Sequence, residues 1–320
     1  MLTKFYFDES LLSSECFMNE LTGSCHDSFL SVWRKYGIYI VCGSQKDTVK
    51  NIISSVPVKH KKKWTLAMER YAKLPSLRTC PVDSNDFEKY KQYSNEFETL
   101  FVDDCRGVVV CDDSYVKYDE DSSFEIVSAG SLDESVNFKR TKNLYLQDIQ
   151  KGESPSKIWS SRFKRFSEIE KNIVIVDQYA LKNIIESVEK GKDSSIKGIL
   201  QCLKGEGKHS ITIYSSGESI NRSDAIAHFG SLLKTPVFSK CISKIRVISV
   251  DKKIFKISTY AHERYFRFGS YVLQVGSGMS IFDTYTTGMC TFSVKPIENT
   301  YSKEIEAECR KSSNWIEDFT

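Results

Sequence analysis

Apolar residues in the second half of the chain fall into short runs that alternate with segments of helical spacing. Residues 172–177 form a continuous apolar run ending in Asp177, which is typical of a strand buried on both faces of a sheet. The same alternation predicts the other elements of this half, which are helices at 156–166, 180–190, 222–233 and 302–311 and strands at 210–214 and 242–250. Strands and helices in this order predict an α/β sheet covered on both faces.

The first half shows a related but less regular pattern. Its apolar segments predict strands at 4–9, 38–41, 100–102, 108–111 and 124–127 and helical segments around 29–33, 46–75 and 87–99. The stretch 152–156, Gly-Glu-Ser-Pro-Ser, has the composition of a linker. We therefore expect a smaller N-terminal domain, α/β or α+β, over residues 1–150 and a second domain over residues 155–320.

Candidate chemistry is concentrated in two expected strands near the C-terminus. His262 and Arg264 are two residues apart, so on a strand both would face the same side. Gly276, Ser277 and Gly278 follow the next strand and predict a tight turn, where N–H groups and a hydroxyl can hold an anion. A nucleophilic imidazole, a fixed cation and an anion-holding turn are what phosphodiester chemistry requires.

Asp177 is a further candidate for this site. It follows the apolar run 172–176, and the carboxyl ends of strands are where α/β proteins usually gather their functional groups. From that position its carboxylate could orient an imidazole. The alternative is a structural role, because aspartate is also a common turn residue at strand ends.

Composition and charge narrow the class of protein. The chain has 320 residues, 27% of them charged, with a net charge of +3, so size and composition suit two globular domains and the charge alone does not indicate a nucleic-acid binder. No apolar run approaches eighteen residues and no charged-then-apolar leader begins the chain, so we expect a cytoplasmic protein.

Two basic runs contain or adjoin aromatic residues. Lys59 to Lys63 precedes Trp64, and Arg162 to Arg165 includes Phe163. Cations next to aromatic rings can bind a single strand by contacting its backbone and stacking on its bases. The alternative for each run is an ordinary solvated face.

Metal sites find little support in the residue spacing. The ten cysteines include no C-x-x-C pair and the five histidines form no cluster, so zinc is not expected and neither is any other cofactor. Acidic residues do follow the apolar segments of the first half and could instead hold Mg²⁺ or Mn²⁺ for phosphodiester cleavage; they are Asp8, Glu9, Asp103, Asp104, Asp112 and Asp113. The opening Tyr6-Phe-Asp-Glu resembles that of ribonuclease-H-type or PIN-type nucleases.

Residues 261–282 resemble the phospholipase D superfamily. Its motif runs His-x-Lys, then an Asp seven residues after the His, then Gly-Ser-x-Asn. His262, Gly276 and Ser277 fall on this pattern, and Arg264 stands where the Lys would be. The guanidinium keeps the positive charge and can bind phosphate with two N–H groups.

The same segment departs from that motif at two positions. Gly269 occupies the Asp position and Met279 the Asn position. A closer resemblance is to the phospholipase D-like domain at the C-terminus of microtubule-interacting-and-trafficking proteins, through His-Glu-Arg-Tyr at 262–265, the glycine-rich turn leading to Ile-Phe at 276–282, and the strand at 290–294. This resemblance covers roughly the last half of the chain and implies a mixed sheet flanked by helices.

The resemblance implies specific roles for the site residues. His262 would attack phosphorus and form a phosphohistidine without a metal ion, while Arg264, Ser277 and the backbone at Gly276 and Gly278 hold the non-bridging oxygens. Such enzymes need a second histidine as general acid. Because the chain has one copy of the motif, a homodimer would supply it; the alternatives within the chain are His209 and His228.

Two functions follow from this resemblance. The first is a metal-independent phosphodiesterase, a nuclease acting on DNA or RNA as an effector of a bacterial antiphage-defence or conflict system, whose N-terminal domain senses a partner protein or regulates. The alternative is a non-catalytic module that binds phosphate, phospholipid or protein, and only then would a membrane surface be a partner. A structural subunit of a larger complex is a third possibility.

Overall fold

The computed structural model describes residues 1–7, 11, 23–42, 53–54, 56–76, 107–111, 124–218, 220–257, 263–283 and 288–320. The chain divides into two compact units, residues 2–144 and residues 145–320, the second also including Met1. The boundary at residue 144 lies a few residues before the one that the composition indicated. No helix in the described part of the chain is long and apolar enough to cross a membrane.

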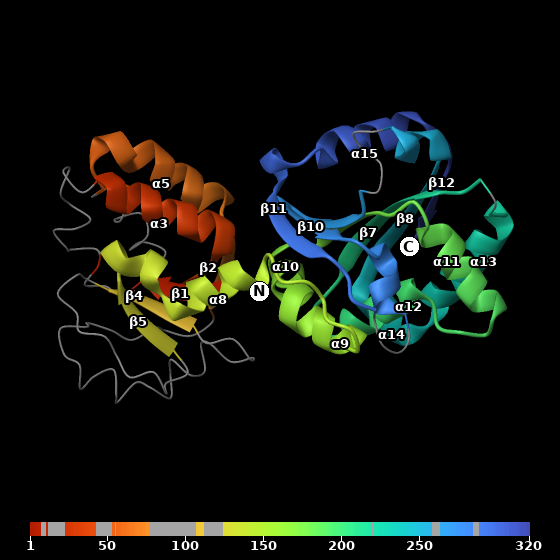
Figure 1. The fold of residues 1–320 in the computed structure, drawn as a ribbon, viewed down its shortest axis with the longest axis horizontal. Coiled ribbons are helices and arrows are strands. Elements are labelled where there is room, and N and C mark those ends of the chain that lie inside the picture. The colour runs from red at the N-terminus through yellow and green to blue at the C-terminus, as the bar shows by residue number, and fades with distance from the viewer. Residues whose placement is uncertain are drawn as a thin grey trace. The chain divides into compact units, whose positions relative to one another are not determined.

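The N-terminal unit contains a five-stranded sheet with the order β3-β2-β1-β4-β5 (Figure 1). Its strands are β1 (Thr3–Phe7), β2 (Gly37–Cys42), β3 (Lys73–Ser76), β4 (Gly107–Cys111) and β5 (Phe124–Ser128). Every pairing is parallel, and the order reverses between β1 and β4, where Phe5 pairs with Val108. Lys73–Ser76 is a strand where the sequence predicted the end of a helix, so the helical prediction for 46–75 was wrong there.

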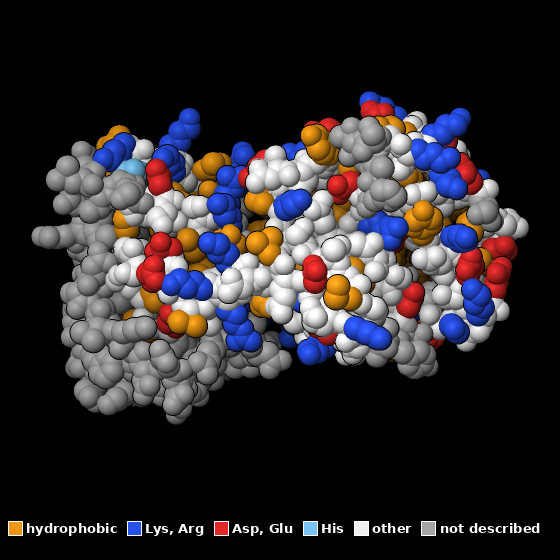
Figure 2. Space-filling view, viewed as in Figure 1, with side chains coloured by type: hydrophobic (Ala, Val, Ile, Leu, Met, Phe, Trp, Pro, Cys, Tyr) orange, Lys and Arg blue, Asp and Glu red, His pale blue; other side chains and the backbone are white. Residues whose placement is uncertain are grey.

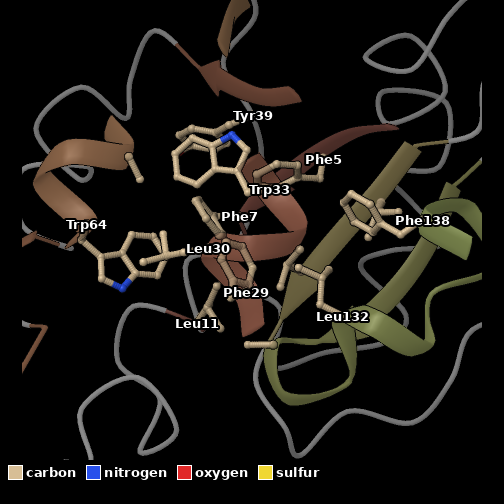
Figure 3. Close-up of a cluster of buried hydrophobic side chains, with 14 of the residues drawn as sticks. Phe5, Phe7, Leu11, Phe29, Leu30, Trp33, Tyr39, Trp64, Leu132 and Phe138 are labelled. Carbon is tan, nitrogen blue, oxygen red and sulfur yellow. The ribbon is translucent and has the colours of Figure 1, made fainter. Parts of the chain in front are cut away.

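Aromatic side chains form the core of this unit (Figure 3). Phe5 and Phe7 are two residues apart on β1 and so face the same side of the sheet, where their ring centroids lie 5.4 Å apart. Helices α3 (Gly23–Tyr36), α5 (Val58–Arg70) and α8 (Val136–Leu144) cover this face, and the short helix η3 (Ala129–Glu134) joins it. They contribute Trp33, Trp64 and Phe138 to the same cluster.

The opposite face of the same sheet is buried as well. Tyr6, Ile38 and Ile40 point to that face and are buried. An all-parallel sheet with apolar residues on both faces is the α/β arrangement rather than the α+β alternative. The α/β class predicted from the sequence is therefore confirmed.

The C-terminal unit contains a mixed seven-stranded sheet with the order β11-β10-β9-β6-β7-β8-β12. Its strands are β6 (Asn172–Val176), β7 (His209–Ser216), β8 (Ile242–Val250), β9 (Tyr265–Phe268), β10 (Tyr271–Val275), β11 (Phe292–Pro296) and β12 (Ser313–Phe319). β6, β7 and β8 are parallel, whereas β9 runs antiparallel to β6. β6 is thus the strand at which the parallel half meets the antiparallel half.

Helices flank both faces of this sheet, as expected (Figure 1). Helix α15 (Ser302–Lys311) covers the face that carries Tyr265, whose hydroxyl donates to the carbonyl oxygen of Ser302 at 3.1 Å. Phe266, the next residue of β9, points to the other face. The other helices are α9 (Pro155–Ile158), η4 (Trp159–Phe163), α10 (Lys164–Ile169), α11 (Ala180–Glu189), α12 (Ser195–Cys202), α13 (Arg222–Lys234), α14 (Pro236–Cys241), η5 (Lys252–Lys256), η6 (Gly278–Phe282) and η7 (Ile297–Asn299).

The helix after the expected linker begins at Pro155, one residue before the predicted position 156. Ser154 is its N-cap, because its Oγ accepts the N–H of Lys157 and Pro155 takes the first helical position. The aromatic residues of this helix are core residues. The ring of Phe163 packs 5.1 Å from that of Phe266 on the sheet.

The last strand, β12, was not predicted from the sequence. It pairs antiparallel with β8 and forms one edge of the sheet. On its exposed face Asp318 accepts hydrogen bonds from Arg246 at 2.7 Å and from Lys244 at 2.8 Å. The partners of Asp318 are on β8, the neighbouring strand. Contacts with β8, and not a local sequence pattern, therefore account for β12.

Replacing Phe163 by alanine should destabilise the C-terminal unit. The side chain is fully buried among aromatic rings, and its removal would leave a cavity that costs about 3–5 kcal/mol. Urea unfolding followed by circular dichroism would measure this loss. Lys157→Ala, at an exposed position of the same helical segment, is the control, and equal midpoints for the two variants would contradict the assignment of Phe163 to the core.

Candidate functional site

The carboxyl end of β6 brings together three strands that are distant in the sequence. Val176, the last residue of β6, pairs with Tyr214 of β7 on one side and with Tyr265 of β9 on the other. Asp177 follows, and its N–H donates to the carbonyl oxygen of Tyr214 at 3.1 Å. Because β9 is antiparallel to β6, its first residues lie at this same end of the sheet, next to Asp177.

The glycine-rich turn lies at this end as well. β10 runs antiparallel to β9 and ends at Val275, so Gly276 and Ser277 leave the sheet close to the start of β9. The N–H of Gly276 donates to the carbonyl oxygen of Thr291 at 3.0 Å, and the N–H of Ser277 contacts Sγ of Cys290 at 3.1 Å. The tight turn predicted after this strand is confirmed.

Asp177 connects the end of β6 to this turn. Its Oδ2 accepts the N–H of Met279 at 2.8 Å and its Oδ1 accepts the N–H of Tyr179 at 2.9 Å. Gly278 has φ +59°, and a Cβ at this position would lie 2.0 Å from Oδ2 of Asp177. Only glycine therefore fits this position with the carboxylate in place.

Arg264 lies on the other side of the turn. Its Nη1 donates to the carbonyl oxygen of Gly276 at 2.8 Å, and its guanidinium carbon lies 4.9 Å from the centroid of the Tyr179 ring. The remaining N–H groups of Arg264 have no hydrogen-bond partner among the described residues. The hydroxyl of Ser277, which is half-buried, likewise donates to none of them. These two groups are the side-chain donors that the described residues of the site can offer to a ligand.

Two carboxyl groups of the site have perturbed titration. Burial raises the pKa of Asp177, and the N–H groups of Met279 and Tyr179 together with the guanidinium of Arg264 oppose that rise. Burial, and then the negative charge of Asp177, raise the pKa of Asp283 to about 6. The site thus holds one cation and two acids, and the charge of Asp177 disfavours the ionisation of Asp283.

The structure brings together five of the six residues that the sequence indicated: Asp177, Arg264, Gly276, Ser277 and Gly278. The sixth, His262, lies outside the described residues. The N–H groups of Gly276 and Met279 already donate to protein atoms. An anion at this turn would therefore depend on the side chains of Arg264 and Ser277 more than the sequence implied.

The two other candidate histidines lie elsewhere in the C-terminal unit. His209 is the first residue of β7, at the opposite end of the sheet, where its ring nitrogens lie 3.0 Å from the carbonyl oxygen of Gly207 and 3.1 Å from that of Ser167. His228 lies on α13, with Nε2 3.1 Å from Oγ of Ser194. Among the described residues, neither histidine forms a hydrogen bond with Asp177, Arg264 or the turn.

The basic runs do not carry the predicted aromatic surfaces. Trp64 is fully buried in the N-terminal core, and Phe163 is fully buried in the C-terminal one, so neither ring can stack on a base. Arg162 is also buried, and its guanidinium donates to the carbonyl oxygens of Gln147 and Asp148. Figure 2 shows Lys and Arg side chains on the outer surface of α3 and α5.

The possible metal site of the first half cannot be placed. Its acids, Asp8, Glu9, Asp103, Asp104, Asp112 and Asp113, lie outside the described residues. The strands that precede four of these acids are neighbours, since Phe7 of β1 pairs with Val110 of β4. Within the described ranges no group of three or more His, Cys, Asp or Glu side chains could hold a metal ion.

Two residues of the site were not identified from the sequence. The ring of Tyr179, which is 39% exposed, makes a cation–π contact with the guanidinium of Arg264. Asp283 follows η6 and interacts electrostatically with Asp177. The only sequence signal for them is position, because each stands two to five residues after a predicted site residue, Asp177 or Gly278.

Comparisons with known proteins yield little. No protein-family model matches the chain, and no curated protein matches it. A solved structure of TrmBL2, described as an archaeal chromatin protein with a novel mode of DNA binding, is 12% identical over 81% of this chain and 84% of that chain, with a TM-score of 0.25. Similarity at that level carries no argument about fold or function.

Gly278→Ala should destabilise the protein more than Gly152→Ala. Both positions have positive φ, and a left-handed conformation costs a non-glycine residue about 1–2 kcal/mol. At Gly152 an added Cβ meets nothing within 4 Å, whereas at Gly278 it would meet Oδ2 of Asp177. Urea unfolding of the two variants measures the difference. Equal losses would mean that the turn does not depend on its contact with Asp177.

Proposed function

We propose that the C-terminal unit is a metal-independent phosphodiesterase that cleaves nucleic acid, with His262 as its nucleophile. The observation that carries this proposal is the convergence of Asp177, Arg264 and the glycine-rich turn at the carboxyl end of β6. His262 precedes Arg264 by two residues in the sequence. The resemblance of residues 261–282 to the phospholipase D superfamily supports the same chemistry.

Each described residue of the site has a role in this reaction. The N–H groups of Arg264 that have no partner among the described residues bind the non-bridging oxygens of the phosphate and neutralise the charge that develops on them. The hydroxyl of Ser277 donates to the same oxygens. Asp177 acts on the turn rather than on the substrate, because both of its oxygens accept backbone N–H groups. Replacing Asp177 would therefore reduce activity by displacing the turn that carries Ser277, and not by removing a group that takes part in the reaction.

A second candidate function is a phosphate-binding module without catalysis. The observation that favours it is the use of the N–H of Met279 by Asp177, which removes a donor from the turn. A turn already bound to a carboxylate can position a phosphate through Arg264 and still give less stabilisation to a transition state. This module and the phosphodiesterase would bind the same ligand and differ in turnover.

His262→Ala should abolish cleavage of single- and double-stranded DNA and RNA in EDTA. Loss of a covalent nucleophile is expected to reduce the rate by roughly 10³-fold or more, while the fold is retained. Gel assays of cleavage and thermal unfolding of both proteins measure these two effects. His228→Ala is the matched control, since it removes a histidine from α13 and should cleave like the original protein.

Other outcomes would decide between the candidates. Binding of nucleic acid without cleavage by the original protein would favour the binding module. Cleavage that is abolished by EDTA but retained in His262→Ala would contradict the proposed mechanism. It would favour a metal site formed by the carboxylates of the first half.

A further inference from the structure

Cleavage of a phosphodiester leaves an oxygen that must gain a proton. When the leaving group is a sugar hydroxyl, its alkoxide is a poor leaving group and a general acid is required. His209 lies at the opposite end of the sheet, and His228 contacts Ser194 from α13. Among the described residues neither is hydrogen-bonded to Arg264 or the turn, so a group attached to the turn is a more direct source of the acid.

Asp283 is attached to the turn through a short, internally bonded segment. η6 begins at Gly278, beside Asp177, and ends one residue before Asp283. The N–H of Asp283 donates to the carbonyl oxygen of Ser280 at 3.0 Å, and Oγ of Ser280 donates to the carbonyl oxygen of Ser277 at 2.7 Å. These bonds tie the position of Asp283 to that of the phosphate-binding turn.

The two carboxyl groups of the site have opposite surroundings. Both oxygens of Asp177 accept backbone N–H groups, which satisfy its ionised form. Oδ1 of Asp283 is buried and has no hydrogen-bond partner among the described residues. Burial and the nearby charge of Asp177 raise the pKa of Asp283 to about 6. Such pairs divide their roles, with one group held ionised and the other keeping its proton.

We propose that Asp283 is the general acid of this site, donating its proton to the leaving oxygen of the phosphodiester from the same chain that supplies Arg264 and the turn. This inference rests on the proposed function and deepens it. The homodimer was expected because a second chain would supply the general acid. With Asp283 as the acid, the second chain is not needed for this purpose.

The nucleophile forms a bond to phosphorus as the bond from phosphorus to the leaving oxygen breaks, and that oxygen takes the proton from the carboxyl group of Asp283. Water then attacks phosphorus and the bond from phosphorus to the nucleophile breaks. The proton of that water passes to the solvent, from which the Asp283 carboxylate regains its own proton. The nucleophile and the protonated carboxyl group are both regenerated, and no oxidant or metal ion is consumed.

Asp283→Asn tests this role through the leaving group. Cleavage of a DNA oligonucleotide, whose leaving oxygen needs a proton, should fall by about 10²–10⁴-fold. Cleavage of bis(p-nitrophenyl) phosphate, whose phenolate leaves without one, should change by less than about threefold, because general-acid catalysis contributes little to a good leaving group. His262→Ala should lose both activities, and that result tests the proposed function separately.

The pH profile provides a second test of the same acid. For the original protein, the rate on DNA should fall as the pH rises through about 6, because Asp283 then loses the proton that it donates. In Asp283→Asn this decline should be absent. Asp283→Glu, which restores a carboxyl group, should recover part of the activity on DNA, and thermal unfolding of each variant confirms that it folds.

Mixing two inactive variants shows which chain supplies the acid. If His262→Ala and Asp283→Asn proteins stay inactive when mixed, nucleophile and acid belong to one chain, as proposed. Recovered activity would assign them to different chains and overturn the same-chain inference. Equal losses on both substrates, or no loss on DNA, would overturn the general-acid role of Asp283 while the proposed function stands. Full activity of His262→Ala would overturn both.

Discussion

The C-terminal site depends on one buried carboxylate. Asp177 accepts the N–H of Met279 from the turn after β10 and the N–H of Tyr179 from its own strand end, so a single side chain holds two distant segments together. A buried carboxylate is costly unless it is hydrogen-bonded, and here both oxygens are satisfied. Gly278 leaves room for it, and the charge of Asp177 adds to the burial that raises the pKa of Asp283.

Much of the fold could be predicted from periodicity alone. β8 was predicted with the bounds 242–250 that the structure has, and α15 likewise as 302–311, because an apolar run and an amphipathic helix are local patterns. β12 could not be predicted, because its residues alternate between half-buried and exposed and it is held in place by pairing with β8. The strand at 73–76 was missed because pairing with β2, not local propensity, makes it extended.

The site was predictable as a set of residues but not as a mechanism. Arg264 and the turn could be grouped because their spacing resembles a known motif, and the antiparallel register of β9 and β10 places them together. The sequence did not reveal that the carboxylate of Asp177 already occupies a donor of the turn. It also did not distinguish Asp283 from an ordinary turn aspartate, because burial and an unsatisfied oxygen are properties of packing. The aromatic residues in the basic runs misled for the same reason, since both proved to be core residues.

The 102-residue separation between Asp177 and Met279 has a consequence for folding kinetics. Closing so long a loop costs entropy before the contact returns any free energy, so such contacts tend to slow folding. The parallel strands β6, β7 and β8 can associate first, while the edge of β6 that later receives β9 stays open. Until β9 adds to it, this apolar edge can pair with another chain. Assembly of the site and protection from aggregation are therefore the same event in this unit.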